Sequence, residues 1–231
     1  MLYIDVSKIV KTEHGIERLQ INLKVHKGEC IGIKGVTGAG KTTLLKLISG
    51  LINPDKGEII FNNKVWYNQK MILPARKRNI GYFIQNGVLY NHMTVLNNIK
   101  FSGAGEEESL ELLALISMYA FKDSLPHTLS GGQRQRILIA RTLAKQKDLY
   151  LFDEPFASLD TRTAWHMADV IKEVQKKSPM ILVSHDYELL SALSDRILIM
   201  ENGRLYESNN KSGTCQGILR VMDLSKRRIS V

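Results

Sequence analysis

The chain has 231 residues, with 44% hydrophobic and 24% charged residues, a composition typical of a water-soluble globular domain with a sizeable core. It carries 32 Lys and Arg against 23 Asp and Glu, a formal net charge of +9. No signal segment opens the sequence and no apolar run is long enough to span a bilayer, so we expect a cytosolic protein.

Charge and cysteine content narrow the function classes further. The basic residues do not form runs interleaved with aromatic residues, so we expect no nucleic acid partner. The two cysteines, Cys30 and Cys215, do not suggest a disulfide framework. A nucleotide-binding protein with surplus lysines agrees with both observations.

The N-terminal third favours antiparallel strands. Residues Leu2 to Val6 and Leu19 to Val25 alternate apolar and polar side chains, with a turn signal at His14-Gly15 between them. Residues 58–61 and 64–67 are separated by two asparagines and predict a hairpin. We therefore expect an antiparallel β subdomain at this end of the chain.

A glycine-rich loop interrupts that region. The apolar residues 29–33 predict a buried strand, and 43–48 carry leucines at helical spacing. Between them runs Gly35-Val36-Thr37-Gly38-Ala39-Gly40-Lys41-Thr42. Glycines let backbone N–H groups close around phosphate oxygens, and the helix start adds its positive dipole end. We expect Lys41 to neutralise the outer phosphates and the Thr42 hydroxyl to hold Mg²⁺.

The middle of the chain changes from strand to helix. An apolar strand, Ile80 to Ile84, ends at Gln85. Thr94 is expected to cap a helix through Phe101, and the acidic triplet at 106–108 to open a second helix, where carboxylates favour the dipole. A third helix is expected from about Gly132 to Lys145.

Strands and helices alternate in the last third. Apolar strands are expected at 149–152, 180–183 and 195–200, with a helix from Thr161 to Lys177. This alternation predicts an α/β fold with a mainly parallel sheet, which binds ligands beyond the carboxyl ends of its strands.

Three of these strand ends carry polar groups suited to phosphate chemistry. The glycine loop follows the first, Asp153-Glu154 the second and Ser184-His185 the third. Asp153 could hold the Mg²⁺ that Thr42 also touches. Glu154 could orient or deprotonate a water aimed at the terminal phosphate, and His185 could donate a hydrogen bond to that phosphate. The sequence therefore predicts a phosphate-transfer site at this edge.

A further motif makes the chain resemble one family. Leu129-Ser130-Gly131-Gly132-Gln133 is similar to the signature of ATP-binding cassette ATPases, between the glycine loop and Asp153. By the same resemblance, Gly35 to Thr42 correspond to Walker A, residues 149–153 to Walker B and Glu154 to the catalytic carboxylate. Gln85 corresponds to the Q-loop, Ser158-Leu159-Asp160 to the D-loop and His185 to the switch histidine.

The resemblance implies a P-loop NTPase core with an inserted helical subdomain, ATP and Mg²⁺ as cofactors, and a second copy of the chain as partner. In such a dimer each ATP lies between Lys41 of one copy and Ser130 of the other, and Asp160 contacts the partner. Catalysis is implied for Glu154, His185, Lys41 and Gln85. Mg²⁺ binding is implied for Thr42, Gln85 and Asp153. The nucleotide-binding residues implied are Val10, Gly35, Val36, Thr37, Gly38, Ala39, Gly40, Lys41, Thr42, Thr43, Ser130, Gly131, Gly132, Gln133 and Asp160.

Within the family, the segment 85–95 resembles the ATPases of molybdate, sulfate, polyamine and maltose importers. We expect one ATPase domain over 1–231, with its core at about 1–85 and 147–207, the helical subdomain at about 86–146 and a tail at 208–231. Those relatives often carry a C-terminal regulatory β-domain, and we expect none within these 231 residues. Exporters and lipoprotein-release systems remain an alternative, and non-transport cassette ATPases are a weaker one.

Two positions depart from the family pattern, and one cluster suggests a partner. Val10 stands where an aromatic residue usually stacks on adenine, so base stacking is expected to be weaker. Lys34 stands where an apolar residue is usual. The residues Val88, Leu89, Tyr90 and Met93 either pack the helical insert or line a groove for a transmembrane permease subunit, which would hold the chain at the cytoplasmic face of the membrane.

Overall fold

The computed structural model describes residues 1–12, 15–175 and 178–208, and every structural statement below refers to them. The strands are β1 (Leu2–Thr12), β2 (Gly15–Val25), β3 (Cys30–Lys34), β4 (Lys56–Phe61), β5 (Lys64–Asn68), β6 (Met71–Ile72), β7 (Ile80–Phe83), β8 (Leu149–Asp153), β9 (Met180–Val183), β10 (Arg196–Glu201) and β11 (Arg204–Glu207). The helices are α1 (Lys41–Ser49), α2 (Val95–Lys100), α3 (Glu106–Leu115), α4 (Gly131–Leu143), α5 (Thr161–Gln175) and α6 (Tyr187–Leu193).

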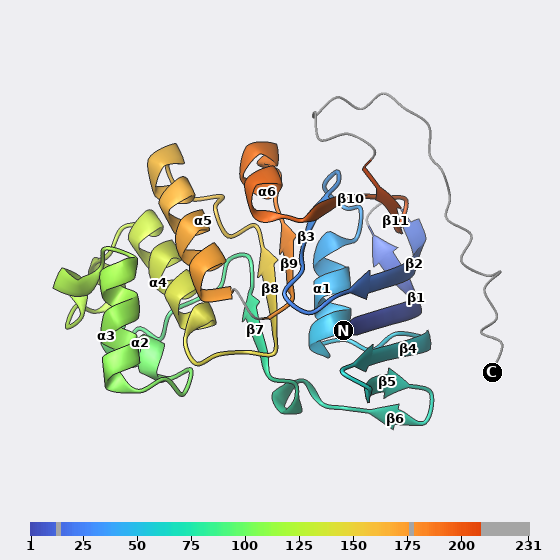
Figure 1. The fold of residues 1–231 in the computed structure, drawn as a ribbon, viewed down its shortest axis with the longest axis horizontal. Coiled ribbons are helices and arrows are strands. Elements are labelled where there is room, and N and C mark those ends of the chain that lie inside the picture. The colour runs from blue at the N-terminus through green and yellow to red at the C-terminus, as the bar shows by residue number, and fades with distance from the viewer. Residues whose placement is uncertain (13–14, 176–177, 209–231) are drawn as a thin grey trace.

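The central sheet has the strand order β11-β10-β3-β9-β8-β7, and all its pairings are parallel except β10 with β11. Every residue of β8 and β9 is buried, because helices cover both faces of a parallel sheet. The carboxyl ends of β3, β8 and β9 therefore meet at one edge (Figure 1). Cys30 lies buried and unoxidised in this core, as its apolar neighbours predict.

The second sheet is antiparallel, with the order β2-β1-β4-β5-β6. Its first two strands are longer than expected: they pair in continuous register from Leu2 opposite Val25 to Thr12 opposite Gly15. Backbone pairing carries the ladder past Val6, where the alternation of apolar residues weakens. The turn expected at His14-Gly15 involves His14, which lies outside the described residues.

Three helices, α2, α3 and α4, follow β7 and precede β8, and they gather at the end of the molecule opposite the antiparallel sheet (Figure 1). Thr94 caps α2 by accepting a hydrogen bond from the Asn97 amide, as predicted. The helix α4 ends at Leu143 rather than Lys145, because Ala144 is extended and Lys145 has a positive φ of 55°. The predicted α/β fold, with an N-terminal antiparallel sheet and a helical insert, is confirmed.

Other predicted ends fall outside the described residues or shift slightly. The helix α5 is described to Gln175, and Lys177 lies outside that range. The predicted tail is described only at Ser208. Within the described parts of the chain, no helix has the length and hydrophobicity that a membrane span needs.

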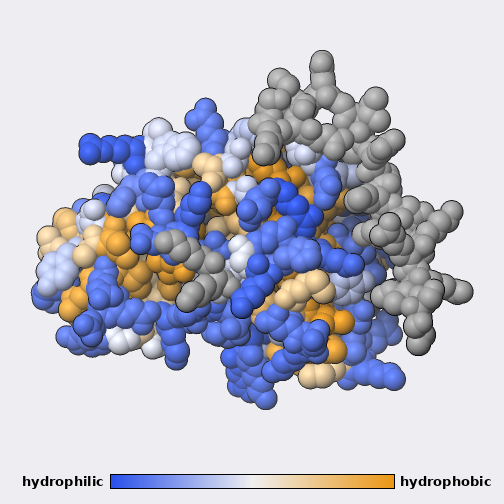
Figure 2. Space-filling view, in the orientation of Figure 1, coloured by the Kyte–Doolittle hydropathy of each residue, from blue (hydrophilic) through white to orange (hydrophobic). Residues whose placement is uncertain are grey.

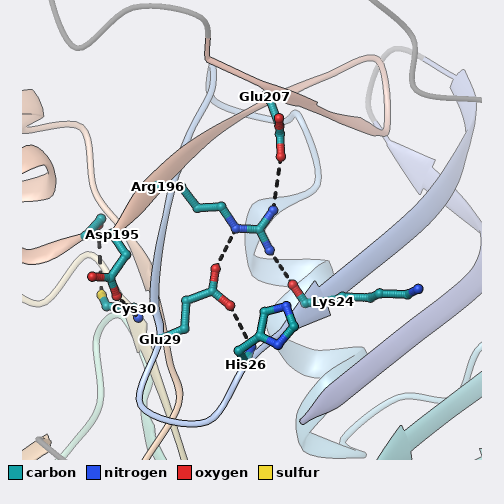
Figure 3. A network of polar contacts seen from close by, with 8 residues as sticks. Lys24, His26, Glu29, Cys30, Asp195, Arg196 and Glu207 are labelled. Atoms are coloured by element: carbon teal, nitrogen blue, oxygen red, sulfur yellow. Dashed lines mark hydrogen bonds and ion pairs between the residues drawn. The ribbon is translucent and has the colours of Figure 1, made fainter. Parts of the chain in front are cut away.

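An arginine joins the two sheets at the amino end of β3 (Figure 3). Arg196 Nε donates to Glu29 Oε1 at 2.6 Å, and its guanidinium also reaches Glu207 and the Lys24 carbonyl. Glu29 Oε2 in turn accepts from the His26 amide at 2.6 Å. These contacts link β2, β3, β10 and β11 at the end of the sheet opposite the strand ends described next.

Candidate functional site

A cavity of about 310 Å³ opens at the carboxyl edge of the parallel sheet. It lies between the antiparallel sheet, the start of α1 and the ends of β8 and β9. Its lining residues are Val10, Glu17, Leu19, Thr37, Gly38, Gly40, Lys41, Thr42, Thr43, Gln85, Asp153, Glu154 and His185. The three strand ends singled out in the sequence therefore contribute to one site.

The loop from Gly35 to Gly40 depends on its glycines. Gly38 and Gly40 have φ angles of 85° and 100°, which favour glycine. A Cβ on Gly35 would lie 2.3 Å from the Met200 carbonyl oxygen. The backbone can therefore pass close to β10, and Gly38 and Gly40 line the cavity at the start of α1.

Lys41 is the first residue of α1 and is buried. Its Nζ donates to the carbonyl oxygens of Gly35 at 2.7 Å and of Val36 at 2.9 Å. Burial lowers the pKa of Lys41, while the carboxylates of Glu154 and Asp153 oppose that shift. The lysine thus sits between the glycine loop and the two acidic residues, where a phosphate group could replace the carbonyl contacts.

Asp153 ends β8 and is only 1% exposed. Burial raises its pKa, and a hydrogen bond with the Thr42 side chain and the charge of Lys41 oppose the rise. Its Oδ2 is buried without a hydrogen-bond partner among the described residues. An unpaired buried carboxylate oxygen beside a threonine hydroxyl suits Mg²⁺. The described residues contain no cluster of three or more metal-binding side chains, so phosphate and water would have to complete the coordination.

Glu154 has a positive φ of 53°, and it turns its buried carboxylate toward β9. Its Oε2 accepts from the His185 amide at 3.2 Å, and His185 Nε2 lies 3.4 Å from Oε1. Burial raises the pKa of Glu154, whereas the His185 amide bond and the charges of His185 and Lys41 lower it. Oε1 is buried and accepts no hydrogen bond within the described chain, and its ion-pair contact is the one with His185 Nε2.

Gln85 is exposed and lines the cavity two residues after the end of β7. Farther along the same segment, Val88 is 76% exposed, whereas Leu89 is 7% exposed and belongs to the core. The packing alternative therefore holds for Leu89. Val88 and Tyr90 are both exposed and together offer an apolar surface. The Tyr90 ring is held in place at 4.5 Å from the Phe101 ring and 5.4 Å from the Arg141 guanidinium.

The signature residues lie outside the cavity, at the start of α4. Ser130 Oγ accepts from the Gln133 amide at 3.2 Å, and Gln133 Oε1 accepts from the Ser130 amide at 2.8 Å, which forms a capping box. The helix is tied to the segment that follows β8, because Gln135 Nε2 donates to the Pro155 carbonyl at 2.8 Å. Asp160 is exposed and caps α5 by accepting from the Thr163 amide and hydroxyl.

The two departures from the family pattern have clear positions. Val10 lines the cavity directly opposite Glu17 in the β1–β2 register. The Lys34 ammonium lies over the Tyr187 ring at 5.1 Å, near His185 in the chain. Sequence reasoning missed Glu17 and Leu19 as cavity residues. Because Val10 was assigned to the base end of the site, the pairing of the two predicted strands could have indicated that the residues opposite it also line the cavity.

The family is decided by comparison with known proteins. Residues 19–157 match the model of the family described as ABC transporter. The chain belongs to the ABC transporter family. That match covers the glycine loop, the signature and the Asp153-Glu154 pair.

Several curated relatives of this ABC protein are import ATP-binding proteins by name. The "Fe(3+) ions import ATP-binding protein FbpC" of Serratia marcescens is 38% identical over 214 residues, 89% of this chain and 62% of the relative. The "Sulfate/thiosulfate import ATP-binding protein CysA" of Pectobacterium atrosepticum is 35% identical over 198 residues, 80% of this chain and 59% of the relative. The chain thus spans about 60% of the length of these relatives.

A solved structure agrees with the fold. The dimeric post-hydrolysis state of the ATP-binding cassette MJ0796 bound to ADP and Pi is 28% identical and has a TM-score of 0.77. The alignment covers 89% of this chain and 96% of that chain.

Proposed function

We propose that this ABC protein is an ATP-hydrolysing subunit that powers a membrane transporter. The observation that carries the proposal is the single cavity in which Lys41, Asp153, Glu154 and His185 meet at the start of α1. Phosphoryl transfer to water depends mainly on positioning the reacting groups and stabilising the developing charge, and these four residues can supply both.

Each cavity residue then has a role. The amides of Gly38, Gly40 and Thr42, which line the cavity, and the Lys41 ammonium bind the phosphates, and Thr42, Asp153 and Gln85 would hold Mg²⁺, which neutralises phosphate charge. Glu154 Oε1, which has no hydrogen-bond partner in the described chain, orients the attacking water and takes its proton. His185, whose Nε2 lies 3.4 Å from Glu154 Oε1, donates a hydrogen bond to the terminal phosphate.

We further propose that two copies close around two ATP molecules. The start of α4, at Ser130 and Gly131, lies outside the cavity of its own chain. It can therefore reach a nucleotide only in a second copy, where its amides and hydroxyl make an anion site. The dimeric MJ0796 structure, which contains ADP and Pi, supports this arrangement.

The partner that receives the work is proposed to be a permease subunit at the cytoplasmic face of the membrane. The exposed Val88 and Tyr90 follow Gln85 closely in the chain, so one segment joins the nucleotide to an apolar surface. Import of a small solute is favoured over export because several relatives, among them FbpC and CysA, are named for import. We propose the core at 1–85 and 147–207, with the helical subdomain at 86–146.

The nucleotide site is tested with Lys41→Ala. We expect ATP hydrolysis by the purified chain to fall by at least about 10²-fold, the usual loss when one charge-stabilising donor is removed. Lys27→Ala, at an exposed lysine between β2 and β3, is the matched control and should hydrolyse ATP normally. Equal activity in both variants would contradict the proposal.

The permease surface is tested with Val88→Glu. Because Val88 is 76% exposed, the variant should fold and hydrolyse ATP, yet fail to co-purify with the permease from membranes. Ile72→Glu in β6, at an apolar residue 53% exposed in the other sheet, should keep the complex. A retained complex in Val88→Glu would remove this surface from the proposal.

A further inference from the structure

The β1–β2 hairpin supplies one wall of the nucleotide cavity. On β2, Leu19 packs against the glycine loop: its Cδ2 lies 3.0 Å from the position that a Cβ on Gly40 would take. Glu17 is two residues from Leu19 on the same strand, so it faces the same side about 7 Å farther from the loop. Both residues line the cavity, so Glu17 lies on its wall beyond the glycine loop that is proposed to bind the phosphates.

The opposite strand places Val10 beside Glu17. Val10 is its direct partner in the antiparallel register and lines the same cavity. None of the described residues that line the cavity is Phe, Tyr or Trp. A base that enters this end therefore meets an aliphatic side chain and a carboxylate instead of an aromatic ring.

A carboxylate distinguishes the two purines by their hydrogen-bond donors. An ionised glutamate only accepts hydrogen bonds, through two oxygens. The Watson–Crick edge of guanine offers two adjacent donors, N1–H and the 2-amino group. The same edge of adenine offers one donor, the 6-amino group, beside the lone pair of N1. Two parallel bonds to a carboxylate are the stronger arrangement, and the adenine N1 lone pair would face a carboxylate oxygen.

We propose that Glu17 determines specificity for the nucleotide base. Its carboxylate accepts hydrogen bonds from N1–H and the 2-amino group of guanine. This inference rests on the proposed function of the cavity. Its consequence is that the chain binds GTP at least as tightly as ATP. Because no aromatic ring from the described lining stacks on the base, the hydrogen bonds at Glu17 account for a larger share of base binding.

The test compares Mg²⁺ complexes of ATP, GTP and ITP by isothermal titration calorimetry on the full chain. Wild type should bind GTP at least as tightly as ATP, with ITP weaker than GTP because hypoxanthine lacks the 2-amino group. Glu17→Gln keeps the side-chain size and adds a donor, so it can pair with both the amine and N1 of adenine. The GTP-to-ATP affinity ratio should fall by at least about fivefold, the lower end of discrimination by one bidentate pair.

Arg18→Gln is the matched control. Arg18 is the neighbour of Glu17 on β2, and its side chain points to the other face of the strand and is exposed. Arg18→Gln removes one charge at the residue next to Glu17, and its GTP-to-ATP affinity ratio should match that of wild type.

Three results would overturn the inference. The first is a wild-type preference for ATP over GTP. The second is an equal loss of ATP and GTP affinity in Glu17→Gln, which would place the carboxylate at the ribose that both nucleotides share. The third is a change of ratio in Arg18→Gln as large as in Glu17→Gln, which would indicate a general charge effect. Failure of folded wild type to bind any of the nucleotides would instead overturn the proposed function as well.

Discussion

The helices α1 and α4 both begin beside glycines, but the surroundings of their first residues differ. The helix α1 begins after Gly40, which has a φ of 100° and no side-chain cap, and its first residue faces a cavity with two buried carboxylates. The helix α4 begins after Ser130, whose hydroxyl and amide are both engaged in a capping box. A Cβ on Gly131 would meet open space.

The difference shows what makes a helix start a reaction centre. Both starts offer amides and a dipole, and these bind an anion without changing it. Only the start of α1 adds a lysine, the buried carboxylate of Asp153 that is proposed to hold Mg²⁺, and the second buried carboxylate of Glu154. The start of α4 can bind phosphate but has nothing to orient a water, so in the proposed dimer it completes a site built by the other copy.

The largest expected effect is at Glu154, the carboxylate that distinguishes the start of α1 from the start of α4. Glu154→Gln should keep ATP binding and reduce hydrolysis by roughly 10²–10⁴-fold, the usual contribution of a positioned acid–base group. Because ATP then persists between the copies, light scattering should show a stable dimer. Near-normal turnover, measured by phosphate release, would contradict the assignment of Glu154.

The next effect sharpens the base end of the α1 cavity. Val10 lines the cavity, and a ring placed there should stack on the base, a contact worth about 1–3 kcal/mol in nucleic-acid complexes. Val10→Tyr should therefore tighten ATP binding by about 5- to 150-fold in an equilibrium titration. Unchanged or weaker affinity would mean that Val10 does not face the base.

A smaller effect tests whether the cap of α4 also serves the dimer. Ser130→Ala removes an N-cap, which should lower the free energy of unfolding by about 1 kcal/mol, and it should also weaken ATP-dependent dimerisation. Thr94→Ala is the matched control, because Thr94 caps α2 through a bond of the same 3.2 Å length. Denaturant unfolding should show similar losses, while analytical ultracentrifugation should show a dimer defect only in Ser130→Ala.

The smallest effect concerns the loop that precedes α1. Lys34 lies over the Tyr187 ring, so it connects the start of the glycine loop to α6. Lys34→Leu should lower the free energy of unfolding by about 0.5–1 kcal/mol, measured in urea. Lys24→Leu, which removes the ammonium over Tyr3 at 5.7 Å, provides the comparison. No loss in Lys34→Leu would show that the contact with Tyr187 does not stabilise the fold.

The sequence alone determined the parts of the site that depend on neighbouring residues. The glycine loop lies between a strand and a helix that are adjacent in the chain, and Asp153 follows directly after an apolar strand. Because the carboxyl ends of parallel strands lie at one edge of a sheet, the alternation of strands and helices predicted that Lys41, Asp153 and His185 lie at the same edge, and the structure places all three in one cavity. The strand periods and the cap at Thr94 were equally local, and they were predicted correctly.

Only the tertiary structure decided which residues far apart in the chain share a surface. The hairpin continues to Thr12 because backbone hydrogen bonds hold it, although the side-chain alternation fades after Val6. That register is what sets Glu17 opposite Val10 and on the wall of the cavity. The burial of Leu89 beside the exposed Val88 was likewise decided by contacts between α4 and the segment after β7. Such contacts depend on how separate elements pack, and no local pattern of residue types encodes them.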